Sequence, residues 1–459
     1  MINVCIQGLG FVGAAMATAV SSKTSKNNKP IYNVVGIDLD NPLGKQRINS
    51  INKGDFPFNT SDKHLLKETK RSHLRGNLIA SSDTNHFRDA DIVLVSTNCD
   101  LELKSGQKKI NLKSFSSGIT TLSEFVKEDV LIIIESTVPP GTCKKIIFPI
   151  FKKSFKERLL NINKLSLAHS YERVMPGEKY FDSIINYWRV FAGINKTSTL
   201  KCKTFLETII NVDQYPLTEL KCTTASETAK VLENSYRAVN IAFIDEWSRF
   251  AEDVGIDLFE VIDAIRFRPT HSNIRQPGFG VGGYCLTKDP LFAKIAAKEI
   301  FNKKGHDFLF STNAVKVNSA MPLQSLRKLN EYFKNNLNGK RLLIMGITYR
   351  EDIGDTRFSP SETFARAAIK QGAEIEAYDP LVNNWPEVKD VKLLNELPAT
   401  DNYDAILFTV AHKHFNKIKL QSWIKNKKTL IFDTNNVLSK NQRKIASNGV
   451  YNFLNIGRG

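Results

Sequence analysis

The chain has 459 residues, 42% of them hydrophobic and 24% charged, and a formal net charge of +17. These proportions are ordinary for a soluble globular protein, and the length suggests two or three domains. The longest apolar runs, such as VLIII at 130–134, are far too short to cross a bilayer. The first residues show no basic region followed by a long apolar region, so we expect no signal peptide. We therefore expect a cytoplasmic protein without membrane insertion.

The positive charge comes from lysines spread along the chain, as in SSKTSKNNKP at 21–30, without a basic-aromatic array. This distribution favours a solvated surface over a nucleic-acid interface. The 6 cysteines form no CxxC pair and no Cys/His cluster with zinc spacing, so we expect no metal site. Five of them are predicted to be small buried hydrophobic residues, namely Cys5, Cys99, Cys143, Cys202 and Cys222.

The N-terminal segment predicts a dinucleotide-binding fold. An apolar strand, INVCIQ, leads into Gly8, Gly10 and Gly13 at G-x-G-x-x-G spacing, and a second strand, YNVVGI, ends at Asp38. The glycines allow a tight turn and a close approach of the backbone to a pyrophosphate at the helix N-terminus. Asp38 would accept hydrogen bonds from the adenosine ribose, which favours NAD. The alternative is a glycine turn that only packs a helix on a strand.

Two further apolar runs, DIVLVST at 91–97 and VLIIIESTVPPGT at 130–142, predict parallel strands that end in hydroxyl residues. The carboxyl ends of such strands line the ligand crevice of a doubly wound sheet. Thr97, Ser136 and Thr137 are therefore candidates to contact cofactor or substrate. Local turn capping explains each of them equally well.

The middle of the chain predicts a long amphipathic helix, SETAKVLENSYRAVNIAFIDEWSRFAEDVG, that closes near Gly255. Lys230 and Asn234 are four residues apart and share one face of this helix. After it comes the glycine-rich loop GFGVGGYCLTKDP at 278–290. Four strand candidates then alternate with helical patterns, namely RLLIMGI, EIEAYDP, AILFTV and TLIFDTN. That alternation predicts a second α/β domain with a parallel sheet.

Six motifs in this order resemble those of the UDP-glucose/GDP-mannose dehydrogenase family, the nucleotide-sugar 6-dehydrogenases. They are GLGFVG, ESTVPPGT, YERVMPG, SETAKVLENSYRAVNIAFIDE, GFGVGGYCLTKDP and GITYREDIGDTRFSPS. The resemblance implies an α/β chain with an N-terminal Rossmann-type NAD domain at 1–215, a central helical dimerisation domain at 216–320 and a C-terminal Rossmann-like UDP-sugar domain at 321–459. It also implies a homodimer.

The activity that the resemblance implies is a four-electron oxidation of the sugar C6 hydroxymethyl to a carboxylate by two NAD molecules in turn. A cysteine adds to the C6 aldehyde, and the adduct is oxidised to a thioester that water hydrolyses. Cys285 matches the nucleophile in G-x-G-x-G-G-x-C-x-x-K-D. Lys288 or Lys230 would favour its thiolate. The alternative, another buried cysteine, fits poorly in a glycine-rich loop.

Four further residues match the catalytic positions of the family. Lys230 and Asn234 would stabilise an alkoxide or oxyanion at C6. Glu172 would act as general base in thioester hydrolysis, directly or through water. Asp289 would hold the attacking water or orient Lys230. The sequence does not divide the hydrolytic role between the two carboxylates.

The resemblance assigns two sets of binding residues. The cofactor set comprises Gly8, Gly10, Gly13, Asp38, Thr97, Thr137, Lys288 and Arg357. The substrate set comprises Arg173, Arg268, Arg275, Gly282, Tyr349 and Arg350, with Arg268 or Arg275 reaching a neighbouring subunit. Arg350 replaces the usual lysine, which keeps the charge but changes the geometry. Asn435 stands where many relatives carry an arginine.

The motif YERVMPG bears on the sugar. Relatives that act on UDP-glucose commonly read PEFLxEG there, whereas those that act on UDP-N-acetylhexosamines read PERxxPG. Arg173 and Pro176-Gly177 favour UDP-N-acetylglucosamine or UDP-N-acetylmannosamine, for surface polysaccharide synthesis, although Tyr171 replaces the leading proline. The alternatives are a UDP-glucose dehydrogenase, a two-electron hydroxy-acid dehydrogenase and a basic nucleic-acid-associated protein on a Rossmann scaffold.

Overall fold

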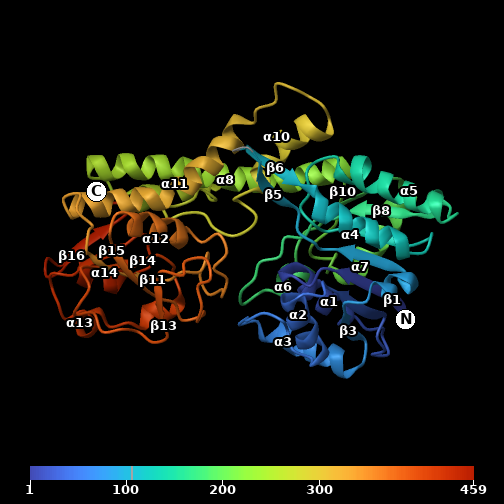
Figure 1. Ribbon diagram of the computed structural model, residues 1–459, viewed down its shortest axis with the longest axis horizontal. Coiled ribbons are helices and arrows are strands. Elements are labelled where there is room, and N and C mark those ends of the chain that lie inside the picture. The colour runs from blue at the N-terminus through green and yellow to red at the C-terminus, as the bar shows by residue number, and fades with distance from the viewer. Residues whose placement is uncertain (105–106) are drawn as a thin grey trace. The chain divides into compact units, whose positions relative to one another are not determined.

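The computed structural model describes residues 1–104 and 107–459 (Figure 1). The chain forms two compact units. The N-terminal unit comprises Met1–Glu233 and Phe292–Asp307, and the C-terminal unit comprises Asn234–Leu291 and Phe308–Gly459. One long helix, α8 (Thr223–Val254), contributes residues to both. It matches the helix expected from the middle of the sequence.

The N-terminal unit is built on an eight-stranded sheet with the order β10-β9-β8-β7-β4-β1-β2-β3. Its strands are β1 (Ile2–Gln7), β2 (Tyr32–Ile37), β3 (Leu78–Ser81), β4 (Ile92–Val95), β7 (Leu131–Ile134), β8 (Ser166–His169), β9 (Val190–Gly193) and β10 (Thr218–Glu219). Neighbours pair in parallel except β8 and β9, which are antiparallel. Gln7 pairs with both Ile37 and Val95, so β1, β2 and β4 end together at the point where the strand order reverses.

Helices pack on this sheet and form its core with it. They are α1 (Phe11–Ser21), α2 (Pro42–Asn52), α3 (Lys63–Leu74), α4 (Leu112–Phe125), α5 (Phe148–Glu157), α6 (Asp182–Ile185) and α7 (Lys196–Ile209). The short helix α10 (Phe292–Ile295) also belongs to this unit. The alanines of α1 are buried against the apolar strands, which brings that helix close to the sheet. A hairpin of β5 (Asp100–Lys104) and β6 (Gln107–Asn111) follows β4.

The C-terminal unit has a six-stranded, wholly parallel sheet with the order β13-β12-β11-β14-β15-β16, drawn in orange to red in Figure 1. Its strands are β11 (Arg341–Met345), β12 (Glu374–Tyr378), β13 (Lys392–Leu394), β14 (Ala405–Phe408), β15 (Leu430–Asp433) and β16 (Asn452–Asn455). Its other helices are α9 (Leu258–Arg266), α11 (Leu309–Tyr332), α12 (Pro360–Lys370), α13 (Leu420–Trp423) and α14 (Lys440–Ala446). The strand order again reverses beside the first strand, β11.

The predicted α/β class is confirmed: the C-terminal sheet is wholly parallel and the N-terminal sheet is parallel except between β8 and β9. All four strands expected in the C-terminal domain are present. The domain boundary expected at 320/321 falls inside α11. Four of the five cysteines expected to be buried are buried, but the prediction is wrong for Cys222, which is exposed just before α8 begins. None of the helices in the described ranges is long and apolar enough to span a membrane.

Candidate active site

The glycine turn between β1 and α1 has the shape that a dinucleotide requires. Gly8 has φ +93°, in the region that favours glycine. A Cβ on Gly13 would lie 1.8 Å from the carbonyl oxygen of Gly8, whereas a Cβ on Gly10 would meet nothing within 4 Å. No side chain caps the N-terminus of α1. The turn therefore leaves backbone and open space beside a positive helix end, which fits a pyrophosphate.

Two other predicted cofactor residues lie at this turn. The Oδ2 atom of Asp38 accepts the Leu9 N–H at 3.2 Å. A Cβ on Gly8 would lie 3.0 Å from Cγ2 of Thr97. Arg47, which sequence analysis missed, pairs with Asp38 at 3.1 Å. Thr137 is half-buried and follows β7 at the same edge of the sheet.

Lys230 and the Glu172 segment come together within the N-terminal unit. Lys230 is 8% exposed, and its Nζ donates to the backbone oxygen of Glu172 at 2.8 Å. The ammonium also lies 5.4 Å from the ring centroid of Tyr171. The Glu172 carboxylate accepts the N–H of Val174. Lys230 thus holds the backbone of the predicted general base.

Arg173 is braced by a residue that sequence analysis missed, Glu233 of α8. Its Nε donates to Glu233 at 3.2 Å, and its Nη2 donates both to Glu233 and, at 3.0 Å, to the hydroxyl of Tyr171. The Tyr171 hydroxyl in turn donates to Glu233 at 2.9 Å. Burial would raise the pKa of Glu233, but hydrogen bonds from Arg173 outweigh it and the pKa is lowered. Tyr171, in place of the family's proline, completes this clamp.

A second unpredicted carboxyl, Glu135, lies at the end of β7. It is 2% exposed, accepts the hydroxyl of Ser96 at 3.0 Å and pairs with Arg189 at 3.3 Å. Burial raises its pKa, against the charge of Arg189, and the charge of Glu172 raises it further. Glu135 is the first residue of the motif ESTVPPGT, but a single glutamate after a strand does not by itself indicate a functional site.

In the C-terminal unit, Asp289 of the cysteine loop bonds to two other predicted residues, Asn234 of α8 and Lys288. Its Oδ2 accepts from Asn234 at 2.8 Å and its Oδ1 from Lys288 at 2.9 Å. Asp289 is 1% exposed, and its N–H donates to the backbone oxygen of Cys285 at 2.9 Å. Cys285 itself is exposed. Asp289 therefore fixes Asn234 and Lys288 to the loop that carries the exposed Cys285.

Tyr349 packs on the same loop. A Cβ on Gly282 would lie 2.7 Å from Cβ of Tyr349, and one on Gly283 would lie 2.8 Å from its ring. Burial raises the pKa of Tyr349 to about 12, and the charges of Asp355 and Cys285 add to the shift. These glycines are needed because a side chain at either position would push the cysteine loop away from the loop that contains Tyr349.

The predicted arginines of this unit differ in their surroundings. Arg357 makes a bidentate pair with Asp355, with contacts of 2.9 and 2.7 Å, and lies over the ring of Tyr284. Arg350 is exposed and pairs with its neighbour Glu351 at 3.3 Å. Arg268 and Arg275 are exposed after α9.

Asn435, at the position of the family's arginine, links two backbones instead of offering a charge. Its Oδ1 accepts the N–H of Phe279 at 3.2 Å, and its Nδ2 donates to the oxygen of Thr409 at 2.9 Å. The amide thus fastens the start of the cysteine loop to the end of β14.

Comparison with known proteins agrees with this arrangement. Three models of the UDP-glucose/GDP-mannose dehydrogenase family match the chain in order: the NAD binding domain matches residues 2–210, the central domain 224–320 and the UDP binding domain 343–440. The glycine turn lies in the first match, the cysteine loop in the second and Tyr349 in the third.

Individual relatives cover nearly the whole chain. The chain is similar to the UDP-N-acetyl-D-mannosamine dehydrogenase of Methanocaldococcus jannaschii, with 31% identity over 444 residues, 95% of this chain and 93% of the relative. The enzyme of the same name from Campylobacter jejuni is 25% identical, over 91% of this chain and 97% of its own. The solved UDP-D-ManNAc dehydrogenase of Pyrococcus horikoshii has the same fold, with a TM-score of 0.81 at 23% identity and 100% of both chains covered.

Proposed function

Since the chain belongs to the UDP-glucose/GDP-mannose dehydrogenase family and is an NAD-dependent nucleotide-sugar dehydrogenase, we propose that it oxidises C6 of a UDP-N-acetylhexosamine to the uronic acid through a thioester on Cys285. The observation that carries the proposal is the exposed thiol of Cys285 on a glycine loop packed against Tyr349. A thiol in that setting is accessible to substrate, whereas a structural cysteine would be buried.

The residues of the glycine turn fit NAD. Gly8, Gly10 and Gly13 would hold the pyrophosphate, Asp38 the adenosine ribose and Thr97 the adjoining part of the cofactor. Bound there, NAD supplies a hydride acceptor for each of the two oxidation steps.

The chain's own residues carry the remaining chemistry. The Cys285 sulfur adds to the C6 aldehyde, and loss of a hydride from the adduct leaves a thioester. Water attacks the thioester carbonyl, the C–S bond breaks and the carboxylate leaves. Lys230 and Asn234 donate to the oxygen on C6, where negative charge develops. Glu172 or Asp289 takes the proton of the attacking water.

UDP-N-acetylmannosamine or UDP-N-acetylglucosamine is the proposed sugar, with UDP-glucose as the alternative. Arg173 with Pro176-Gly177 supports this choice, as do the relatives whose names specify UDP-N-acetyl-D-mannosamine. Because Glu233 and Tyr171 already engage Arg173, we propose that the arginine shapes the pocket by holding the loop. We propose that the enzyme acts in the cytoplasm and that its product is used for surface polysaccharide synthesis.

We also propose a homodimer formed through α8. Five side chains of the C-terminal unit, each 48–52% exposed, follow one face of this helix: Tyr236, Phe243, Trp247, Phe250 and Val254. Apolar stripes of this kind mark protein interfaces. Arg268 and Arg275 would then reach the substrate of the neighbouring subunit.

NADH yield on a panel of UDP-sugars tests the proposal. We expect two NADH for each UDP-N-acetylmannosamine or UDP-N-acetylglucosamine consumed, a uronic acid by mass spectrometry and a higher kcat/KM than with UDP-glucose. One NADH with an aldehyde or ketone product would exclude the thioester route. A clear preference for UDP-glucose would show that the proposed sugar is wrong.

Substitution of the nucleophile gives the second test. Cys285→Ala should abolish uronic acid formation, and Cys285→Ser should form it very slowly because serine is the weaker nucleophile. Cys222→Ala, which changes the other exposed cysteine, is the matched control and should retain activity. Normal acid production by Cys285→Ala would refute the assignment.

A further inference from the structure

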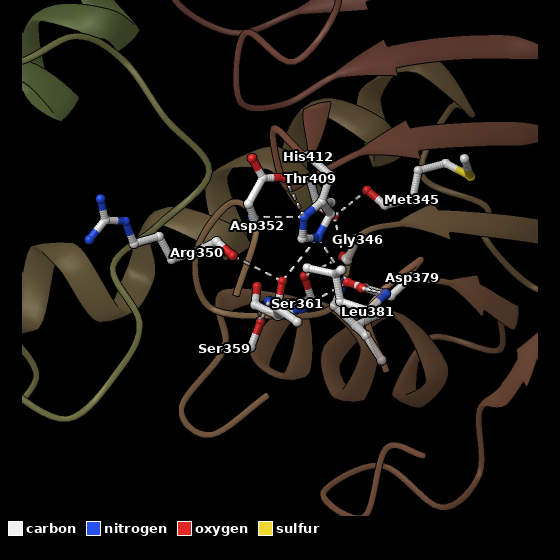
Figure 2. Close-up of polar contacts among 12 residues, drawn as sticks. Met345, Gly346, Arg350, Asp352, Ser359, Ser361, Asp379, Leu381, Thr409 and His412 are labelled. Atoms are coloured by element: carbon white, nitrogen blue, oxygen red, sulfur yellow. Dashed lines mark hydrogen bonds and ion pairs between the residues drawn. The ribbon is translucent and has the colours of Figure 1, made fainter. Parts of the chain in front are cut away.

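A polar cluster lies where three neighbouring strands of the C-terminal sheet end (Figure 2). Asp379 directly follows β12, the loop from Gly346 follows β11, and His412 follows β14 by four residues. His412 is 1% exposed and Asp379 is 3% exposed. None of the roles proposed above uses either residue.

The hydrogen bonds of His412 define its tautomer. The backbone N–H of Asp352 donates to Nδ1 at 3.0 Å, so Nδ1 carries no proton. The proton is therefore on Nε2, which lies 3.1 Å from Oδ2 of Asp379 and 3.0 Å from the hydroxyl of Thr348. The ring is thus a neutral connector with one accepting and one donating side.

Both sides of the ring connect to the same short loop. Thr348, which accepts from Nε2, donates its own hydroxyl proton to the backbone oxygen of Arg350 at 3.1 Å. Asp379 accepts the N–H groups of Ile347 and Thr348 at 2.8 and 3.2 Å. Burial would raise the pKa of Asp379, but the hydrogen bond from His412 outweighs it and the pKa is lowered. One imidazole therefore holds the loop on either side of Tyr349 and Arg350.

The hydrogen bond from the Asp352 N–H to His412, which we call the tether, stabilises an unfavourable turn. Asp352 has φ +55°, a left-handed conformation that costs an aspartate free energy unless its surroundings hold it. Besides the bond to His412, the Asp352 carboxylate accepts the N–H of Lys413 at 3.1 Å. Figure 2 shows the Arg350 side chain extending away from the cluster while its backbone oxygen points into it.

We propose that His412 is a positioning residue for nucleotide-sugar binding: it presets the 347–352 loop so that Tyr349 and Arg350 are held in their binding conformation. This inference rests on the proposed function, which assigns both residues to the substrate. A preset loop binds more tightly because the ordering cost is not paid on association. The tether acts on binding and not on the chemistry at C6.

Three substitutions separate the two sides of the ring. His412→Ala removes both, and we expect it to raise the KM for the UDP-sugar and the Kd for UDP about tenfold, with kcat changed less than about threefold. His412→Asn places an amide oxygen near Nδ1 and should restore most of the affinity. His412→Gln places its amide near Nε2 and should behave like His412→Ala, because Asp379 and Thr348 bond to the loop without the ring, whereas the Asp352 N–H loses its acceptor. His414→Ala, two residues along and exposed, is the control.

A readout that needs no turnover keeps this inference separate from the proposed function. Amides of the 348–357 segment should exchange hydrogen faster in His412→Ala than in the wild type, with the rest of the sheet unchanged. If the wild type oxidises no UDP-sugar but the exchange pattern holds, the proposed function fails and the tether stands.

Three results would overturn the tether. They are unchanged exchange in His412→Ala, a lower kcat with unchanged KM, and equal affinity of the Asn and Gln variants for UDP. Should His412→Ala not fold, the comparison of the Asn and Gln variants decides the question.

Discussion

Directly after β2, the Asp38 carboxylate accepts the N–H groups of Leu9, in the glycine turn, and of Leu39, and it pairs with the guanidinium of Arg47. This carboxylate would repel a 2′-phosphate, so the wild type should use NAD in strong preference to NADP. In Asp38→Ala this repulsion is lost and Arg47 is released beside the ribose site, where a guanidinium favours a phosphate. We expect the ratio of kcat/KM for NAD to that for NADP to fall sharply.

The double variant Asp38→Ala/Arg47→Ala separates the two effects. It should lose the gain with NADP, because the cation that attracts the phosphate is gone. Equal use of both cofactors by the wild type would contradict the role of Asp38. If the double variant used NADP as well as Asp38→Ala does, the role of Arg47 would be contradicted.

Arg173 is engaged by Glu233, by Tyr171 and by the backbone oxygen of Trp188. Arg173→Lys keeps the charge but loses the fork, and we expect it to lower kcat/KM about tenfold, since hydrogen bonds between charged groups contribute about 1.5–3 kcal/mol. Because the clamp holds the Glu172 loop, the loss should be equal for UDP-N-acetylhexosamines and UDP-glucose. Kinetics on both sugars measure it.

Glu233→Gln tests whether the clamp is a single unit. Its effect and that of Arg173→Lys should not add in the double variant, because each change breaks the same contact. A selective loss with the acetamido sugar would instead mean that Arg173 contacts the substrate.

Among the secondary-structure elements, the long parallel strands and α8 could be predicted from the sequence. Strands buried on both faces appear as continuous apolar runs, and β4, β7, β11 and β14 each contain four buried residues in succession. The β5–β6 hairpin was not predicted because its sequence, DLELK and QKKIN, is too charged to suggest strands.

The candidate site was predictable where backbone chemistry demands a residue type and unpredictable where tertiary contacts choose a partner. Gly8, Gly13, Gly282 and Gly283 were found because the backbone conformation or a close neighbour leaves no place for a side chain. Glu233 and Arg173 are 60 residues apart in the sequence, and His412 and Asp379 are 33 apart, so neither pair leaves a local pattern. Asp379 alone carried a signal, since it follows a strand as Asp38 does.

The contact between β8 and α8 predicts a pH dependence of stability. His169, the last residue of β8, is fully buried with its Nδ1 2.8 Å from the hydroxyl of Ser226, and burial lowers its pKa to about 3. In the unfolded chain its pKa is about 6.5. The unfolded state therefore binds the proton first as the pH falls, and stability present above about 6.5 is lost progressively toward about 3.

Between pH 7.5 and pH 5, this histidine should lower the free energy of unfolding by about 2 kcal/mol. The asparagine of His169→Asn cannot be protonated. Over the same pH range, the free energy of unfolding of this variant should therefore fall by about 2 kcal/mol less than that of the wild type. Urea unfolding at the two pH values measures the difference, with His64→Asn, an exposed histidine of the same unit, as control. Parallel pH profiles for His169→Asn and the wild type would contradict the prediction.

For the whole molecule, the stripe on α8 bears on assembly. Its members are separated by seven, four, three and four residues, which keeps them on one helix face. Phe243, Trp247 and Phe250 also contact one another edge to face. In a two-fold dimer the same patch serves both subunits, so one helix face suffices.

Trp247→Glu places a charge within this patch, and we expect it to convert the dimer into a monomer at assay concentration, as measured by light scattering. Leu200→Glu on α7 changes an exposed apolar side chain outside the patch, and this variant should remain dimeric. A monomeric wild type would refute the proposed assembly. If Arg268 acts across the interface, the Trp247→Glu monomer should also lose activity.

Mixing two inactive variants tests that exchange directly. In a heterodimer of Cys285→Ala with Arg268→Ala, one of the two sites would combine an intact cysteine with an intact arginine from the other subunit. After exchange at equal concentrations, half the dimers are mixed and each has one complete site, so activity should recover to about a quarter of the wild type. If Arg268 serves its own subunit, one site of the mixed dimer lacks the cysteine and the other lacks the arginine. Mixing would then give no more than the residual activity of Arg268→Ala. Recovery well above that residual rate therefore requires a dimer in which each subunit completes the substrate site of the other.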